Sequence, residues 1–285
     1  MTAAALPLHA QSLGREPGAG VDTFVMIHGY GGSSFSWRHW APELARRGHV
    51  VLVDMKGHGS APKPDDDRYG PADQAELVDR LIAERALRQV TLVGHSLGGG
   101  VVLLTALRLL DAARRTGREA VLKRIVMVAG AAYEQRVPPF VPLARHPWLF
   151  MVLMRVLGAN LIVRFVLRTI VYDPDSIVEE QVAGYAEPLA SSDAVRALIA
   201  SARRIVPENL GELTARFTEL DVPTLLLWGR HDPVVPLAVG ERLSRELPRA
   251  RLRVLEACGH LPAEEHPDES LAILRAFLDG GLAAV

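Results

Sequence analysis

Five residues, Gly94-His95-Ser96-Leu97-Gly98, constrain the fold of this chain more than any other part of its sequence. They follow an apolar, β-branched run, Gln89 to Val93, and they precede a helix-like run, Gly99 to Leu110. A serine between glycines at such a junction is typical of a nucleophile elbow, a tight strand-to-helix turn that exposes the serine hydroxyl. The glycines let neighbouring chain approach closely. The helix behind the serine offers free N–H groups and a positive dipole end. The pattern therefore predicts that Ser96 is a nucleophile.

Apolar runs of strand length alternate with helical patterns along most of the chain, and several of these runs are continuous. Continuous apolar runs are typical of strands that are covered on both faces. Strands are predicted at Thr23 to His28, His49 to Asp54, Val90 to Val93, Arg124 to Ala129, Val222 to Trp228 and Arg251 to Glu256. Helices are predicted at Trp37 to Gly48, Pro71 to Leu87, Leu97 to Arg115, Pro236 to Leu247 and Pro267 to Leu278. This alternation predicts an α/β fold with a mostly parallel central sheet flanked by helices, to which Leu8 to Leu13 adds an antiparallel strand.

The alternation stops between Ala131 and Leu220, where no core strand is evident. This stretch opens with a Pro-rich linker, Val137 to Pro142, and continues with helical segments that include Ser192 to Val206 and Pro207 to Leu220. The simplest arrangement is an all-helical insertion between two strands of one sheet. We therefore expect a core made of residues 1–130 and 221–285 and a helical cap made of residues 131–220.

The most apolar segment, Trp148 to Tyr172, contains Arg155, Arg164 and Arg168 and is broken near Gly158-Ala159-Asn160. No uninterrupted apolar stretch reaches the roughly 18 residues of a spanning helix. Each central arginine would also cost a few kcal/mol in a bilayer. We therefore expect two buried or half-buried helices and no membrane span, and contact between the apolar cap and a lipid surface stays open.

Composition excludes several classes of function. Lys and Arg total 32 and Asp and Glu total 33, so the formal charge of −1 gives no support for nucleic-acid binding. The single cysteine, Cys258, excludes an intrachain disulfide and a multi-cysteine metal site. Met1 to Ala10 has neither the cationic part nor the long apolar part of a secretory signal, so a cytoplasmic location is expected. The oligomeric state is not indicated.

No motif for a metal or a cofactor is found in the sequence. The acidic triplet Asp65-Asp66-Asp67 lies in a Pro-rich loop and is typical of a solvated turn. No H-E-x-x-H spacing is present. The glycines of Gly29 to Gly32 are not followed by the Gly-Lys-Ser/Thr of a phosphate loop, and Gly98-Gly99-Gly100 does not match a dinucleotide fingerprint. We therefore expect neither a metal nor a cofactor.

A serine hydroxyl needs a base to attack at neutral pH, and the base needs a carboxylate to orient it. His260 is the leading base, because it follows a predicted strand on a glycine-containing loop. Asp232 is the leading carboxylate, because it also follows a predicted strand. Open α/β sheets place their sites beyond the carboxyl ends of strands. Taken singly, Asp232 fits a turn or helix cap before Pro233, and His260 fits an ordinary loop histidine. Together with Ser96 they predict a catalytic triad.

The reaction of such a triad also needs N–H donors aimed at the developing oxyanion. The first predicted donor is the backbone N–H of Leu97, immediately after the nucleophile. The second comes from the loop after the strand predicted at Thr23 to His28, where glycines permit an inward-pointing N–H. Tyr30 is the preferred second donor and Gly31 is the next candidate.

With these motifs in place, the chain resembles the α/β-hydrolase superfamily, in its group of small esterase-like enzymes with a helical cap. The resemblance covers residues from about 22 to 280, and the matching segments are His28-Gly29, Ser36-Trp37, Asp54 to Ser60, Gly94 to Gly99, Trp228 to Asp232 and Gly259-His260. It implies the chain order serine, aspartate, histidine, which Ser96, Asp232 and His260 match. It also implies that the helical insertion is a lid over the active site. Relatives usually have arginine where Lys56 stands, and we expect this to change the ion pairs of the loop and not the chemistry.

The resemblance implies a serine hydrolase of carboxylesterase type. Its expected substrates are small to medium lipophilic esters, thioesters or lactones, cleaved through an acyl-enzyme intermediate. Residues expected to line the pocket are Gly29, Gly31, His95, Met151, Met154 and Phe165, although packing of the lid on the core also accounts for the last three. Alternatives that keep the triad are a C–C bond hydrolase, an acyltransferase and a perhydrolase. A non-catalytic binding protein of the same fold is a further alternative. Ser96 argues against dehalogenases and epoxide hydrolases, which use aspartate at that position.

Overall fold

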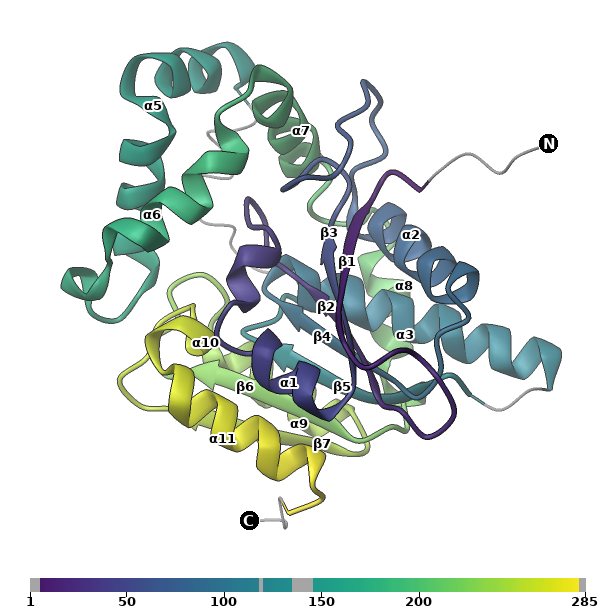
Figure 1. Ribbon diagram of the computed structural model, residues 1–285. Coiled ribbons are helices and arrows are strands. Elements are labelled where there is room, and N and C mark those ends of the chain that lie inside the picture. The colour runs from purple at the N-terminus through teal and green to yellow at the C-terminus, as the bar shows by residue number, and fades with distance from the viewer. Residues whose placement is uncertain (1–5, 118–119, 135–145, 282–285) are drawn as a thin grey trace.

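A seven-stranded sheet forms the centre of the computed structural model, which describes residues 6–117, 120–134 and 146–281 (Figure 1). Its strands are β1 (His9–Gly14), β2 (Thr23–Ile27), β3 (His49–Asp54), β4 (Val90–His95), β5 (Leu122–Val128), β6 (Thr224–Gly229) and β7 (Ala250–Leu255). Their order is β1-β3-β2-β4-β5-β6-β7, and every neighbouring pair is parallel except β1 with β3. The predicted sheet is confirmed, including its antiparallel first strand, with strand ends that differ by one or two residues.

The strand order reverses beside β2. The chain runs from β2 outward to β3 and then returns to β4 on the other side of β2, so that Thr23 pairs with both His49 and Val90. In open α/β sheets, the crevice outside the carboxyl ends of the strands at such a reversal is where ligands bind. The loops that follow β2 and β4 therefore meet at the expected position of a site.

Alternate residues of the strands pack on opposite faces of the sheet, as the two-residue period of a strand requires. In β2, Val25 and Ile27 belong to one core cluster, and Phe24 and Met26 belong to the other. The first face is covered by α2 (Pro71–Glu84), α3 (Leu97–Thr116) and α9 (Leu237–Glu246). The second face is covered by α1 (Ala41–Arg47) and α11 (Pro267–Leu278), and the short helix α10 (Pro262–Glu265) follows β7 (Figure 1).

The described residues between β5 and β6 contain no strand. Their helices are α5 (Pro147–Ile170), α6 (Glu179–Ala186), α7 (Ser192–Arg203) and α8 (Leu210–Ala215), with short 3₁₀ helices η2 (Pro174–Ser176), η3 (Glu187–Leu189) and η4 (Phe217–Glu219). We call residues 146–220 the helical segment. Its helices α5, α6 and α7 lie beyond the carboxyl ends of the strands (Figure 1). Its last part instead packs on α3, where Arg216 pairs with Asp111 at 2.6 Å. The predicted linker at Val137 to Pro142 lies outside the described residues.

Two predicted helices are shorter than expected. The helix predicted at Trp37 to Gly48 is a 3₁₀ turn, η1 (Ser34–Trp37), followed by α1 from Ala41. Pro42 explains the break, because proline has no N–H to continue a helix and is tolerated only in the first turn. The helix predicted at Pro207 to Leu220 is divided into α8 and η4, and Arg216 between them turns toward α3.

Among the residues that the structure describes, one helix, α5, is long and apolar enough to cross a membrane by length and composition alone. Gly158, with φ 77° and ψ 156°, interrupts its helical backbone at the predicted place. The two parts, residues 147–157 and 159–170, are each shorter than the roughly 20 residues that span a bilayer. Both parts are half-buried, as predicted: Phe150, Met154, Val163 and Leu167 are buried, whereas Trp148, Val156 and Phe165 are largely exposed. The apolar residues of α5 cover both of its faces, and only one face packs inward.

Candidate active site

Ser96 lies in the turn that joins β4 to α3. Its φ of 52° and ψ of −120° place a non-glycine residue in a strained part of conformational space. Glycine is required on both sides of it. A Cβ on Gly94 would lie 2.3 Å from the Gly98 carbonyl oxygen, and a Cβ on Gly98 would lie 2.3 Å from the Ile27 carbonyl oxygen. The surrounding chain thus packs so closely that it holds the serine in this conformation, at the N-terminus of a long helix.

The structure brings Ser96, His260 and Asp232 together from three separate loops. The Ser96 Oγ lies 2.9 Å from His260 Nε2, and His260 Nδ1 lies 2.8 Å from Asp232 Oδ2. Both His260 and Asp232 are buried. The hydrogen bonds assign the tautomer in which Nδ1–H donates to the carboxylate and Nε2 accepts from the serine hydroxyl. This arrangement matches the geometry needed for proton transfer from the hydroxyl to the imidazole.

The Asp232 carboxylate is fixed by its second oxygen. Asp232 Oδ1 accepts hydrogen bonds from the backbone N–H groups of Val234 and Val235, at 2.8 and 2.9 Å. Because these donors occupy Oδ1, Oδ2 is left directed at His260. The turn that starts at Asp232, which was the alternative explanation for this residue, is therefore present. The same turn also directs the carboxylate at His260.

Hydrogen bonds to neighbouring elements fix the backbone of the loop that carries His260. The His260 N–H donates to the carbonyl of Ile170, at the end of α5, at 2.8 Å, and the His260 carbonyl lies 2.9 Å from His95 Nε2. Glu265 accepts hydrogen bonds from the N–H groups of Gly259 at 2.9 Å, Leu261 at 2.9 Å and Tyr172 at 2.7 Å. The backbone on both sides of the imidazole is thus bonded to one carboxylate and to the C-terminal end of α5.

The two predicted oxyanion donors belong to the two loops that meet at Ser96. Leu97 is the first residue of α3, and its N–H has no acceptor among the described residues. The same holds for the N–H of Tyr30 within the described ranges. Gly29 brings the Tyr30 loop against the nucleophile, since a Cβ on Gly29 would lie 3.0 Å from the Ser96 Cβ. Gly31, at φ 71°, then turns the loop away. Both N–H groups are free to donate to a ligand atom beside Ser96.

His28 and His58 are buried, His95 is half-buried, and all three support loops. His28 Nε2 accepts from the Met55 N–H at 3.1 Å, and its Nδ1 lies 2.7 Å from the Gly29 carbonyl. Burial lowers the pKa of His28, and it lowers the pKa of His95 to about 3 with a further contribution from the adjacent His260. Burial also lowers the pKa of His58 to about 3. These imidazoles stay neutral near pH 7, and their hydrogen bonds fix the conformation of the loops around Ser96. His231, next to Asp232, is exposed.

Lys56 is buried and forms an ion pair with Asp66, whose two carboxylate oxygens lie 2.5 and 2.8 Å from Nζ. The same ammonium donates to the Arg68 carbonyl at 3.1 Å and lies over the ring of Tyr69. The middle of the acidic triplet is therefore engaged by a cation of the chain itself. Within the described residues, no three histidine, cysteine or carboxylate side chains gather in a group that holds a metal ion.

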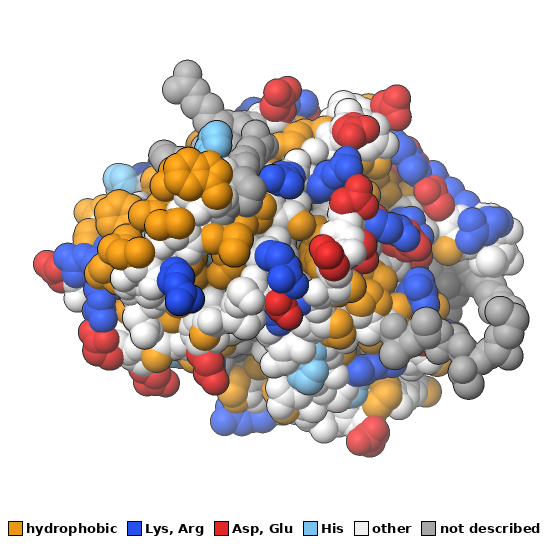
Figure 2. All heavy atoms as spheres, turned by 90° about the horizontal axis from the view of Figure 1, so that it is seen from above, with side chains coloured by type: hydrophobic (Ala, Val, Ile, Leu, Met, Phe, Trp, Pro, Cys, Tyr) orange, Lys and Arg blue, Asp and Glu red, His pale blue; other side chains and the backbone are white. Residues whose placement is uncertain are grey.

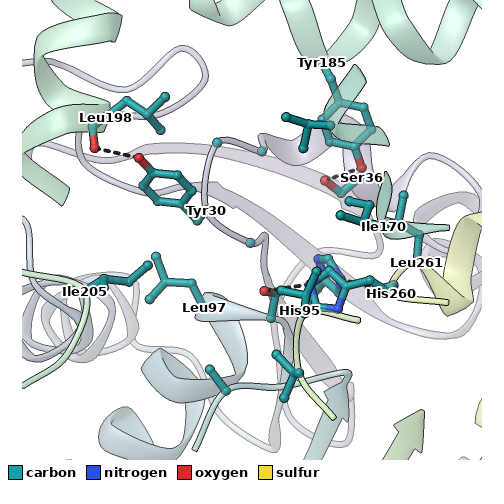
Figure 3. Close-up of a pocket in the computed structure, with 18 of the residues that line it drawn as sticks. Tyr30, Ser36, His95, Leu97, Ile170, Tyr185, Leu198, Ile205, His260 and Leu261 are labelled. Carbon is teal, nitrogen blue, oxygen red and sulfur yellow. Dashed lines mark hydrogen bonds between the residues drawn. The ribbon is translucent and has the colours of Figure 1, made fainter. Parts of the chain in front are cut away.

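A cavity of about 870 Å³ opens beside Ser96, between the core loops and the helical segment. Figure 3 shows Tyr30, His95, Leu97 and His260 of the core facing Tyr185, Leu198 and Ile205 of the helical segment. Of the predicted lining residues, Gly29, Gly31, His95, Met154 and Phe165 line the cavity. Met151 does not, because it lies on the outer face of α5 with 42% of its surface exposed, and this prediction is corrected. No described lining residue is aspartate, glutamate, lysine or arginine.

Contacts that the sequence did not reveal tie the helical segment to the core. The Tyr185 hydroxyl lies 3.0 Å from Ser36 Oγ and also bonds to Glu264, which in turn accepts from Arg38 at 2.9 Å. The Tyr30 hydroxyl donates to the Leu198 carbonyl of α7 at 3.0 Å (Figure 3). Burial raises the pKa of both tyrosines, so both stay protonated donors. A local signal for these contacts in the sequence is the pair Glu264-Glu265, which begins four residues after His260.

Comparison with known proteins shows similarity along almost the whole chain. The model of the alpha/beta hydrolase family matches residues 24–273. An uncharacterized hydrolase of Bacillus subtilis, YugF, is 28% identical over 91% of this chain and 89% of its own length. A 2-hydroxy-6-oxononadienedioate/2-hydroxy-6-oxononatrienedioate hydrolase of Cupriavidus pinatubonensis is 28% identical over 88% of this chain and 84% of its own.

Solved structures show the same similarity in three dimensions. An alpha/beta hydrolase fold protein from Burkholderia ambifaria superposes with a TM-score of 0.79 at 25% identity, covering 94% of this chain and 93% of its own. An esterase from Exiguobacterium antarcticum superposes with a TM-score of 0.75 at 20% identity, covering 95% of each chain, which shows a shared fold.

Proposed function

Since the chain belongs to the alpha/beta hydrolase family, we propose that it is a serine hydrolase that cleaves neutral, lipophilic carboxylic esters, thioesters or lactones. The observation that carries this proposal is the continuous hydrogen-bonded chain from Ser96 Oγ through His260 to Asp232, with distances of 2.9 and 2.8 Å. Ser96 is the nucleophile, His260 the base and Asp232 the group that orients the base. The Leu97 and Tyr30 N–H groups serve as the oxyanion hole.

The proposed reaction uses each group in turn. Ser96 Oγ attacks the carbonyl carbon while His260 Nε2 takes the hydroxyl proton, and the oxyanion accepts hydrogen bonds from the two N–H groups. Asp232 holds the imidazolium by accepting from Nδ1–H. His260 then gives the proton to the leaving alcohol, and an acyl group stays on Ser96. Water attacks this acyl-enzyme with His260 again as base, which releases the acid and restores the serine.

The cavity supports a neutral, lipophilic substrate. Its described lining carries no charged side chain, and an unpaired carboxylate or ammonium is costly in such surroundings. Its volume of about 870 Å³ suits a molecule with a medium-length acyl chain. We propose that residues 131–220 act as the cap, in which the described helices α5, α6 and α7 cover this cavity and Arg216, in the last part, rests on α3.

The alternative is hydrolysis of a C–C bond with the same triad, which the relative from Cupriavidus pinatubonensis favours by its name. A dioate would bring two carboxylates to this cavity, and its described lining offers no cation to pair with either. This observation favours the ester over the dioate.

The test compares p-nitrophenyl esters of increasing acyl length with a vinylogous diketone, using wild type, Ser96→Ala and the control Ser60→Ala. Ser96→Ala is expected to lower kcat by at least about 10⁴-fold and to abolish labelling by a fluorophosphonate probe, because the nucleophile is gone. Ser60, an exposed serine, should be replaceable without loss. Full turnover by Ser96→Ala would refute the proposal. A higher kcat/KM for the diketone than for every ester would establish the C–C alternative.

A further inference from the structure

The first half of α5 presents an apolar face to solvent. Trp148, Met151, Val152 and Val156 recur at the spacing that places residues on one side of a helix, and we call these four residues the outer face. Trp148 is 71% exposed and Val156 is 73% exposed. The opposite side of the same half, with Phe150 and Met154, packs on α7. Figure 2 shows hydrophobic side chains gathered over this part of the molecule. Contiguous exposed apolar surface of this kind marks a contact site.

Three further exposed apolar residues of α5 lie between the outer face and the end of the helix. They are Leu157, Leu161 and Phe165, and Phe165 is 69% exposed. All three residues also line the cavity beside Ser96. We call these three residues the rim. A partner that covers the outer face therefore lies near the rim, whose exposed apolar side chains also line the cavity.

The charges of α5 fit an anionic partner. The helix contains three arginines and neither aspartate nor glutamate. Arg155 is exposed between Val152 and Val156, and it has no ion pair with any residue that the structure describes. Arg164 and Arg168 pair with Glu179 and Asp175 beside the rim, at 2.5 and 2.8 Å. An arginine at the edge of an apolar face lays its stem along that surface and presents its guanidinium to phosphate.

We propose that the outer face of α5 docks on the surface of a phospholipid bilayer with anionic headgroups, and that the rim takes lipophilic substrate from that bilayer. An exposed tryptophan and aliphatic side chains beside an arginine are the features of helices that lie in the membrane interface. The break at Gly158 leaves each half too short to span the bilayer. A second copy of the chain fits less well, because a twofold contact would bring the same face against itself, and α5 offers no carboxylate to Arg155.

The fluorescence of Trp148 reports whether the outer face contacts a vesicle. The other three tryptophans, Trp37, Trp40 and Trp228, are buried, so a change in exposed tryptophan emission belongs to Trp148. On addition of vesicles of phosphatidylcholine mixed with phosphatidylglycerol, we expect a blue shift of the emission, protection from acrylamide and sedimentation of the protein with the vesicles. The inactive Ser96→Ala protein should bind equally well. The measurement therefore stays informative even if the proposed esterase activity is wrong.

Substitutions on the outer face show whether these residues bind the vesicles. The triple variant Trp148→Ser/Val152→Ser/Val156→Ser should sediment with the mixed vesicles at least about 100-fold more weakly, because three apolar side chains no longer enter the interface. Its turnover of a water-soluble short ester should stay within about twofold of wild type, since none of the three residues lines the cavity. Arg155→Gln should weaken binding to the mixed vesicles about fivefold and leave binding to pure phosphatidylcholine unchanged. Val178→Ser, another exposed apolar position, is the matched control and should bind as wild type.

The proposal is overturned if wild type stays in the supernatant and Trp148 emission does not change with either kind of vesicle. It is also overturned if the triple variant binds as wild type does. A dimer in solution that becomes a monomer in the triple variant, without vesicle binding by wild type, would assign the outer face to a second copy. If the triple variant fails to fold, as loss of short-ester turnover and of its melting transition would show, the Trp148 measurements on wild type decide.

Discussion

The substitution Asp232→Asn tests the proposed triad at its most constrained atom. The two backbone N–H groups of Val234 and Val235 hold Oδ1, and Oδ2 faces His260 Nδ1. An asparagine that keeps its oxygen on the two N–H groups presents its NH₂ to Nδ1. The imidazole must then accept at Nδ1 and carry its proton on Nε2, where it points at the Ser96 hydroxyl. In that tautomer, His260 cannot take the serine proton.

The size of the effect follows from the free energy needed to rotate the new side-chain amide so that its oxygen and nitrogen exchange places. Reversal would leave two buried N–H groups facing an NH₂, at about 1–3 kcal/mol each, or about 2–6 kcal/mol together. At 1.36 kcal/mol per tenfold, this corresponds to a roughly 30-fold to 10⁴-fold excess of the unproductive tautomer. Loss of the charge that stabilises the imidazolium adds to this effect. We therefore expect kcat to fall by about 10³- to 10⁴-fold.

The assay is steady-state turnover of a p-nitrophenyl ester, together with the rate of fluorophosphonate labelling. KM should change little, because Asp232 does not line the cavity. Asp65→Asn is the matched control, since it removes an exposed carboxylate outside the site. If Asp232→Asn keeps its melting temperature and loses less than about tenfold in kcat, the orienting role assigned to Asp232 is refuted.

Three further predictions address the scaffold. Gly98→Ala should lower the unfolding free energy by about 3 kcal/mol, because its Cβ would meet the backbone of β2 at 2.3 Å, and a denaturant titration that matches wild type would exclude this packing. Glu265→Gln should lower kcat about tenfold with little change in KM, since the loop of His260 loses a charged acceptor for three N–H groups, and an unchanged kcat would contradict that positioning role. Because the pKa values of His58 and His95 are lowered in the folded chain, the unfolded chain binds more protons than the folded chain between pH 6.5 and about 3. The unfolding free energy should therefore fall as pH drops from about 6.5 toward 3, by up to about 1.4 kcal/mol per unit for each histidine. Urea titrations at several pH values measure this slope, which should be smaller in His58→Gln.

The positions of the triad could be predicted because each member follows a strand. The strands that precede Ser96, Asp232 and His260 are parallel, so their carboxyl ends meet at one edge of the sheet. The pattern of apolar runs therefore predicted that these three residues lie close together, although they are far apart in the sequence. The length of a helix beside a proline and the exact ends of strands depend on tertiary contacts, and these predictions were less accurate.

The inner and outer faces of α5 could not be distinguished from sequence. Its apolar residues occur on both sides, so periodicity does not show whether Met151 or Met154 faces the core. The structure places Met154 in the cavity and Met151 outside it. The contacts of Tyr185 and Glu264 were also not predictable, because they join residues about 80 positions apart without any local pattern.

The hydrogen bond from the His260 N–H to the Ile170 carbonyl has a consequence for how the cavity opens. Lifting the C-terminal end of α5 away from the sheet would drag the base out of line with Ser96. An opening motion that keeps His260 beside Ser96 must leave that end of α5 in place, so it is confined to the part before the break at Gly158, which carries Trp148. Access to the cavity and the position of the proposed base thus depend on different halves of α5.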